Sequence, residues 1–198
     1  MTKLTIDDIA DLRAYERERV DFRTRIIALK KRRRIGVGPF VTFLFENRDT
    51  IRFQIQEMAR AEKIVTDDGI QTELDIYNPL IPEPGTLSAT MFLELTSDEQ
   101  LREWLPKLVG IEAKVRFELG EGEGAVQVPC TVDPDHEKQL TRDEITASVH
   151  YIGFHFTAAQ VDAFGAGPVA LVVDHPAYQH RTTLGSDNVE ELLADLQG

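Results

Sequence analysis

The pattern of apolar and polar residues predicts helices early in the chain and strands late in it. Before residue 80, apolar residues recur three and four positions apart, as on the buried face of a helix. After residue 85, shorter runs rich in β-branched and aromatic residues indicate strands. The early part is expected to hold a helix of about residues 9–33, a strand 40–45, a helix 50–65 and a short helix that ends at Asn78.

The later part alternates expected strands with short helices. A glycine-rich turn, Gly120–Gly124, predicts a hairpin, and the run 168–173 is apolar on both faces, as in a strand inside a sheet. The predicted strands are 87–95, 113–119, 125–132, 145–156 and 168–173, with helices around Trp104, after Thr157 and from Asp187, and a helical turn at Thr141–Glu144.

This order of elements predicts an α+β fold in which a mostly antiparallel sheet packs against N-terminal and central helices. The length suits a single domain, residues 1–198. Within it, residues 1–85 form a mainly helical part with one strand, and residues 86–198 form a sheet-rich part.

Composition limits the compartment and the kinds of site. Cys130 is the single cysteine, which excludes an internal disulfide and a multi-cysteine zinc or iron–sulfur site within one chain. No apolar run is long enough to cross a bilayer, and the N-terminus lacks the apolar core of a secretory signal. Gly36-x-Gly38 lacks the third glycine of a dinucleotide loop, so no nucleotide cofactor motif is present. We therefore expect a cytoplasmic protein with no membrane partner.

Charge is distributed unevenly along the chain. Residues 1–63 hold 15 Lys or Arg and 10 Asp or Glu, a net of +5, whereas residues 64–198 hold 7 and 24, a net of −17. The acidic part argues against nucleic-acid binding, which needs a broad basic face. The basic run Lys30–Arg34 closes the first helix, where cations favour the negative end of the helix dipole. The alternatives are an anion or partner site, and docking against the acidic remainder of this chain or of a second copy.

One candidate carboxylate lies on the 50–65 helix. This carboxylate, Glu62, ends an apolar stripe roughly 60° wide on the helix. The residues of the stripe are four, three and four positions apart: Ile51, Ile55, Met58 and Glu62. A carboxylate buried there must be paired, protonated or metal-bound, because burying a free charge is costly. The alternative is that Glu62 turns into water at the helix end or pairs with a basic residue. Gln54 and Glu57 lie beside the stripe.

Two histidines lie on or next to predicted strands. His150 alternates with Ile152 and therefore points inward, where it is either a satisfied core histidine or a ligand, whereas His155 points to the other face. Asp174-His175 follows the inner strand 168–173, and side chains at strand ends often form sites. A histidine beside a carboxylate suits metal ligation or acid–base chemistry, although Asp174 alone could cap the turn.

Six segments, in this order, resemble the bacterial domain of unknown function 3501 family: KKRRRIGVGPFVTFLFENRDTIRFQIQEMARAE, ELDIYNPLIP, SATMFLELT, LVGIEAKV, TASVHYIGF and VVDHPAY. The resemblance covers nearly the whole chain. It implies a cytoplasmic bacterial protein associated with rubrerythrin-type and iron–sulfur oxidoreductase proteins, and hence a redox or peroxide-stress setting. The positions that it marks are Arg48, Gln54, Glu57, Glu62, Tyr77, Asn78, His150, Asp174, His175 and Tyr178.

Two functional hypotheses follow. In the first, the protein is a metal-binding or small-ligand-binding redox accessory, and whether it is an enzyme stays open. His150, His175, Asp174 and Glu62 would then hold iron, manganese or zinc, and a ligand would contact Glu57, Gln54, Arg48, Tyr77, Asn78 and Tyr178. In the second, the protein is a non-catalytic interaction protein that docks an oxidoreductase partner or forms a homodimer, and the buried His and Glu form a structural hydrogen-bond network.

Overall fold

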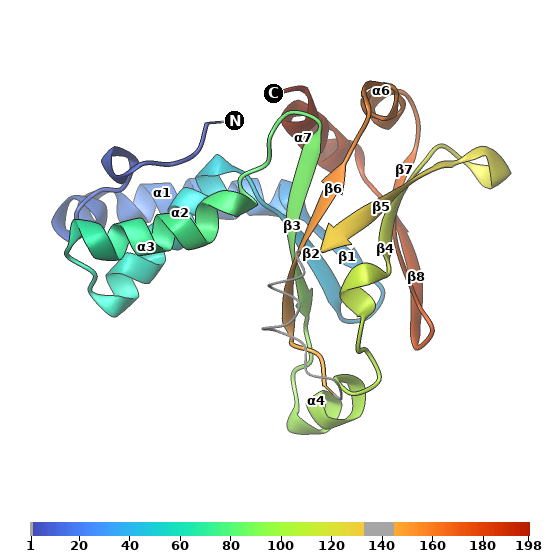
Figure 1. Ribbon diagram of the computed structural model, residues 1–198, viewed down its shortest axis with the longest axis horizontal. Coiled ribbons are helices and arrows are strands. Elements are labelled where there is room, and N and C mark those ends of the chain that lie inside the picture. The colour runs from blue at the N-terminus through green and yellow to red at the C-terminus, as the bar shows by residue number, and fades with distance from the viewer. Residues whose placement is uncertain (1, 133–144) are drawn as a thin grey trace.

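Eight strands form one antiparallel sheet that curls into a nearly closed barrel, with the N-terminal helices beside part of its outer face (Figure 1). The computed structural model describes residues 2–132 and 145–198. The strand order is β1-β2-β3-β6-β5-β4-β7-β8, and each neighbouring pair is antiparallel. The predicted α+β class with a sheet packed against helices is confirmed.

The elements follow the predicted order, with two additional strands. The α-helices are α1 (Leu12–Arg33), α2 (Arg48–Glu62), α3 (Asp67–Tyr77), α4 (Asp98–Trp104), α6 (Ala158–Ala166) and α7 (Ser186–Gln197). The strands are β1 (Arg34–Val37), β2 (Val41–Phe45), β3 (Thr86–Leu93), β4 (Val115–Leu119), β5 (Val126–Val132), β6 (Val149–His155), β7 (Val169–His175) and β8 (Tyr178–Thr183). Short 3₁₀ turns lie at η1 (Ile6–Asp8), η2 (Asn78–Leu80), η3 (Ile111–Ala113) and η4 (Gly122–Gly124).

The prediction of one strand before residue 85 is wrong, because β1 and β2 form a hairpin there. β1 follows α1 without an intervening loop and is only four residues long. Its apolar and polar residues therefore could not be told apart from those at the end of the helix. β8 was also missed, because four of its six side chains are exposed and it lacks an apolar alternation. The helical turn expected at Thr141–Glu144 lies outside the described residues.

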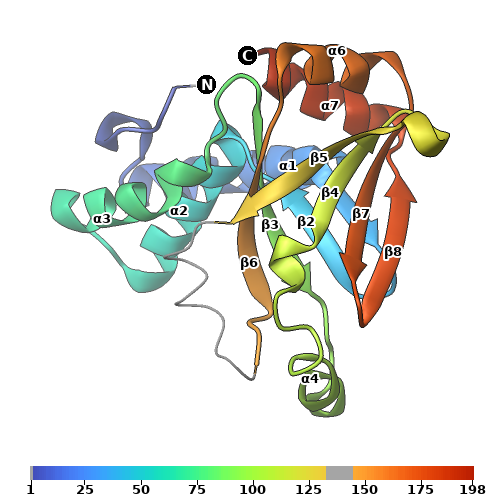
Figure 2. The same ribbon diagram turned by 45° about the vertical axis from the view of Figure 1, so that its right-hand side comes forward.

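The main core fills the barrel. Phe117 lies 5.6 Å from Phe45 and 4.7 Å from Phe154 between ring centres, and all three side chains are fully buried. α6 and α7 cover one end of the barrel, and α4 lies at the other end (Figure 2). Phe164 of α6 packs on Phe117, so the end cap is continuous with the core. In the described part of the chain, no helix combines the length and apolar character that a bilayer crossing requires.

Side chains of β8 close the barrel against β1. The hydroxyl of Tyr178 donates to the carbonyl of Val37 at 2.7 Å and accepts from the backbone N–H of Val41 at 3.2 Å. The hydroxyl of Thr182 donates to the carbonyl of Gly36 at 2.8 Å. These bonds satisfy backbone groups of β1 and of Val41, the first residue of β2, so Tyr178, which was expected to bind a ligand, here holds the edges of the sheet together.

The basic run at the end of α1 docks on acidic residues of its own chain. Arg32 lies 3.4 Å from Glu191 of α7, and Arg34 lies 3.1 Å from Glu94. Arg33 is fully buried and contacts both Glu191 and Asp195. The run also closes the helix as expected, since Lys30, Lys31, Arg32 and Arg33 lie in the last turn of α1. The structure therefore shows both a helix-end position and intramolecular docking for this run.

Candidate functional site

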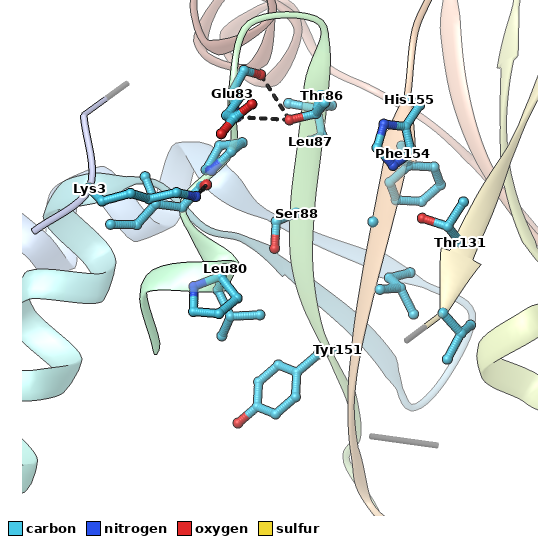
Figure 3. Close-up of a pocket in the computed structure, with 16 residues that line it drawn as sticks. Lys3, Leu80, Glu83, Thr86, Leu87, Ser88, Thr131, Tyr151, Phe154 and His155 are labelled. Atoms are coloured by element: carbon cyan, nitrogen blue, oxygen red, sulfur yellow. Dashed lines mark hydrogen bonds between the residues drawn. The ribbon is translucent and has the colours of Figure 1, made fainter. Parts of the chain in front are cut away.

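Two adjoining pockets lie on the outer face of β3 and β6, where the helices meet the barrel. The larger, of about 550 Å³, has a floor of Ser88, Gly153 and Thr131, which are cross-strand neighbours on β3, β6 and β5 (Figure 3). The connector Pro79–Glu83 forms its wall. The smaller, of about 270 Å³, lies between this sheet face and helices α1 and α2. Leu80 and Tyr151 line both pockets.

The smaller pocket, called here the interlayer pocket, carries more charge than the larger one. Its charged and polar lining comes from α1, α2, the α3–η2 junction and the outer positions of the strands: Lys30, Arg34, Glu46, Thr50, Gln54, Tyr77, Thr90 and Tyr151. Its apolar lining is Leu44, Ile51, Leu80, Phe92 and Val149. Apolar walls with a few placed polar groups are typical of small-molecule sites. Gln54 and Tyr77 are the two predicted ligand contacts that line it.

Glu46 is the fixed anion of the interlayer pocket. Its side chain is buried, and its Oε1 and Oε2 accept hydrogen bonds from the hydroxyls of Thr90, at 2.6 Å, and Thr50, at 2.5 Å. The position follows from local structure, since Glu46 lies between the end of β2 at Phe45 and Asn47, whose side chain caps α2. A carboxylate has about four lone-pair sites, so each oxygen of Glu46 retains acceptor capacity for a ligand.

Lys30 is the half-buried cation of the same pocket. Its Nζ lies 5.2 Å from the centre of the Phe53 ring. Burial lowers the pKa of Lys30, Glu46 opposes this effect, and nearby Arg34 adds a smaller lowering. Within the described residues, Lys30 and Glu46 do not form a salt bridge, although both line the pocket. The pocket therefore presents a positive and a negative group that are not consumed by each other.

The four predicted metal ligands do not gather into one group. Glu62 is the last residue of α2 and is exposed, so the expected alternative of a side chain turned into water is the one observed. Asp174 is also exposed and pairs with Arg116 at 2.9 Å. Among the residues that the structure describes, no three His, Cys, Asp or Glu side chains are arranged to hold a metal ion.

The predicted histidines are both buried, in different hydrogen-bond settings. His175 has its Nε2 at 3.2 Å from the carbonyl of Val109, and its Nδ1 accepts from the N–H of Ala177 at 3.2 Å. A neutral imidazole with the proton on Nε2 satisfies both bonds. His150 points inward as predicted, and its Nε2 lies 2.9 Å from the carbonyl of Ala147. These contacts fit the structural-network hypothesis.

Glu112 is a buried carboxylate that the sequence pattern did not reveal. It lies on η3, is fully buried, and its Oε2 is 3.9 Å from Nδ1 of His150. Neither of its carboxylate oxygens has a hydrogen-bond partner in the described part of the chain. In the sequence, Glu112 is an acidic residue that directly follows Ile111 in an apolar segment. Hydrophobic periodicity cannot distinguish such a residue from one on the surface.

The remaining predicted ligand contacts join the N-terminal region to the helices. Arg48 pairs with Asp8 at 2.5 Å. The side-chain amide of Asn78 bonds both the N–H and the carbonyl of Leu4, each at 2.9 Å. These contacts fix the start of the chain against α2 and η2. They consume the polar atoms that a ligand would otherwise use.

Glu57 joins α2 to α1. Its two carboxylate oxygens accept from Nε and an Nη of Arg19, both at 2.8 Å, and one also accepts from the Tyr15 hydroxyl at 2.6 Å. The Arg19 hydrogen bonds, and then that of Tyr15, lower the pKa of Glu57 against the effect of burial. Burial and the Glu57 bond in turn raise the pKa of Tyr15.

We expect Glu57→Gln to destabilise the protein at pH 7 and to have less effect in acid. A carboxyl whose folded-state pKa is depressed contributes stability above its unfolded value of about 4.3, and loses it as the pH falls through the folded value. Urea denaturation of both proteins at several values between pH 7 and pH 3 checks this. Parallel stability curves would contradict it, and Glu62→Gln, at the exposed end of the same helix, is the matched control.

Comparisons with known proteins agree on the family. The model of a protein family described as "Protein of unknown function (DUF3501)" matches residues 3–196. A crystal structure of a novel protein of unknown function from Burkholderia pseudomallei K96243 is 38% identical and has a TM-score of 0.88, covering 98% of this chain and 100% of that one. No curated protein matches. A family match over nearly the whole chain, with a solved relative of the same fold, shows that the protein belongs to the DUF3501 family of unknown function.

Proposed function

We propose that the protein binds a short organic acid in the interlayer pocket and serves as a small-ligand-binding accessory protein. The observation that carries the proposal is the separation of Lys30 and Glu46, which line one pocket of about 270 Å³ and do not pair. A ligand with a carboxylate for Lys30 and a hydroxyl or ammonium for Glu46 would satisfy both. The volume lies just below the range typical of drug-sized ligands, so the ligand has few heavy atoms.

The other lining residues support an acid of this kind. Arg34, the first residue of β1, adds a second cation to the lining, so Lys30, Arg34 and Glu46 give a net positive pocket in an acidic protein. Gln54 supplies both a donor and an acceptor from α2. Burial raises the pKa of Tyr151, which keeps its phenol protonated at neutral pH. Together these groups favour an anionic end and a hydrogen-bonding end in one small molecule.

Isothermal titration with L-lactate and L-serine tests the proposal. We expect saturable binding of at least one of them. Lys30→Met should weaken it about 10- to 100-fold, as expected for the loss of a hydrogen bond to a charged group worth about 1.5–3 kcal/mol. Lys31→Met is the control, because Lys31 is exposed and does not line the pocket. No binding of either acid, or equal weakening in both variants, would refute the proposal.

We also propose a cytoplasmic role in redox chemistry or peroxide stress. This part of the proposal rests only on the family resemblance, which implies an association with rubrerythrin-type and iron–sulfur proteins. The pocket supports binding of an organic acid, but no comparable site supports binding of iron, manganese or zinc. Residues 2–132 and 145–198 contain no group of three His, Cys, Asp or Glu side chains placed to hold a metal ion. The metal hypothesis is tested by measuring the metal content of the untagged parent protein and of the His150→Ala and His175→Ala variants.

One surface favours the alternative function of docking a partner. Val20 and Ile27 of α1 are 72% and 44% exposed and lie seven residues apart, on one face of the helix. Arg13, Arg17 and Lys31 lie exposed along the same face. Apolar positions among cations suit an acidic partner, such as an oxidoreductase or the acidic remainder of a second copy.

Sedimentation velocity tests self-association through this face of α1. We expect a homodimer at low ionic strength that dissociates as salt is added, because exposed charges are screened at high salt. Val20→Asp with Ile27→Asp should give a monomer at all salt concentrations. A parent protein that is monomeric under every condition would exclude self-association through this face, and the docking hypothesis would then require a different partner protein.

A further inference from the structure

We propose that Lys30 captures a small carbonyl compound in the interlayer pocket by forming an imine through its Nζ. The inference rests on the proposed function, because it uses the same pocket and narrows the ligand from a short acid to a short keto acid or aldehyde acid. It also gives the pocket a chemical step that binding alone does not require.

The position of Lys30 is the geometric basis of the inference. Lys30 lines a pocket large enough for a few heavy atoms, and its Nζ lies 5.2 Å from the centre of the Phe53 ring. In the described part of the chain it forms neither an ion pair nor a hydrogen bond, so the amine is not held by a carboxylate. Of the other four charged ends of the basic run, those of Arg32, Arg33 and Arg34 are engaged by acidic side chains, and Lys31 is exposed and does not line the pocket.

The surroundings of Lys30 favour the reactive form of the amine. Only a neutral amine attacks a carbonyl carbon, and lysines acquire this reactivity when they are desolvated or lie beside another cation. Burial, the largest influence here, lowers the pKa of Lys30, and the charge of Arg34 lowers it by less than Glu46 raises it. Glu46 acts in the opposite direction and limits the effect.

The step balances without an oxidant or a reductant. The neutral Nζ of Lys30 adds to the carbonyl carbon, and the carbonyl oxygen becomes the hydroxyl of a carbinolamine after proton transfer from Nζ. Protonation of this hydroxyl by solvent lets it leave as water while the C=N bond forms. The product is a protonated imine, whose positive charge lies in the same pocket as the Glu46 carboxylate. Hydrolysis reverses the sequence and releases the carbonyl compound.

The Glu46 carboxylate is suited to stabilise the imine cation. Hydrogen bonds from Thr50 and Thr90 hold it in place before any ligand arrives, so no reorganisation is needed when the charge forms. The same arrangement explains why a cationic adduct would be tolerated in a pocket that already contains Arg34. A ligand carboxylate could then contact Arg34, whose guanidinium has more donors than its bond to Glu94 uses.

Reductive trapping tests the inference on the full-length protein. The protein is incubated with pyruvate or glyoxylate and sodium cyanoborohydride, and the sites of the added mass are mapped on peptides. The chain has seven lysines, which provide internal comparison sites. We expect more label on Lys30 than on the other six together. Lys31→Arg should keep this label and Lys30→Arg should lose it, with circular dichroism confirming that both variants are folded.

The outcomes separate this inference from the proposed function. Label spread evenly over the lysines, or concentrated on Lys31, would overturn the imine. Binding of L-lactate without trapping of pyruvate at Lys30 would also overturn it, while the acid-binding proposal would stand. Neither binding nor trapping would refute both. If Glu46→Gln folds and lowers the label on Lys30 but not on the other lysines, the role of the Glu46 carboxylate is supported, and an unchanged label would remove it.

Discussion

Replacement of Arg33 by methionine is expected to lower the free energy of unfolding by about 3–5 kcal/mol, as when one partner of a buried ion pair is removed. The Arg33 side chain is fully buried, and its guanidinium donates to the carbonyls of Phe45 and Glu46 at 2.8 and 3.1 Å. It also pairs with Glu191 and Asp195 of α7. Methionine fills a similar volume but leaves two carbonyls and a buried carboxylate without a partner. Urea denaturation at pH 7 measures the loss.

The effect of Arg33→Met should depend on pH. Burial already raises the pKa of Asp195 with Arg33 beside it. Without Arg33, the folded state binds a proton at Asp195 more readily than the unfolded state, so stability falls as the pH rises through the raised value. The deficit relative to the parent should therefore be smaller in mild acid than at pH 7. Arg32→Met is the matched control, because Arg32 is about half exposed and should contribute less than about 1 kcal/mol.

Sequence reasoning located side chains well where one regular element decides their direction. The period-two pattern of strand β6 placed His150 inward, and its side chain is 2% exposed. The same pattern placed His155 on the opposite face, where it is exposed. Alternation is reliable here because a strand has only two faces and one of them fills the barrel.

The reasoning was weaker at element ends. Glu62 completes a helical stripe on paper, but α2 ends at that residue, and Lys63 takes a left-handed conformation with φ of 57°. The last buried residues of α2 are instead Ile55, Gln56 and Ala59. A stripe predicts burial only as far as the helix continues against its neighbour, and that limit is set by tertiary contacts.

The interlayer pocket could not be predicted from the sequence because no single element contains it. Lys30 comes from α1, Glu46 from the position after β2, and Tyr151 from the outer face of β6. Each of these side chains is ordinary in its own segment, and the presence of Lys30 and Glu46 in one pocket depends on how α1 packs on the sheet. A signal was present in the outward face of β3, where the polar residues Thr86, Ser88 and Thr90 alternate with buried apolar ones.

The second large effect is expected for Gly38→Ala, which should lower the free energy of unfolding by about 2–4 kcal/mol. Gly38 has φ of +75°, where an L residue costs about 1–2 kcal/mol. An added Cβ would also lie 2.5 Å from the Tyr178 hydroxyl and 2.5 Å from Cγ of His180. Tyr178 would have to move, breaking hydrogen bonds that close the barrel and are worth about 0.5–1.5 kcal/mol each.

Gly36→Ala is the matched control for Gly38→Ala in the same hairpin. A Cβ at Gly36 would meet nothing within 4 Å, so we expect a change of less than about 0.5 kcal/mol. A double-mutant cycle with Tyr178→Phe separates the two causes. If the clash with the hydroxyl matters, Gly38→Ala should cost less in the Tyr178→Phe background, and the remaining cost comes from backbone strain and the contact with the His180 ring. Equal losses for both glycines would mean that the β1–β8 closure does not depend on the close approach at Gly38.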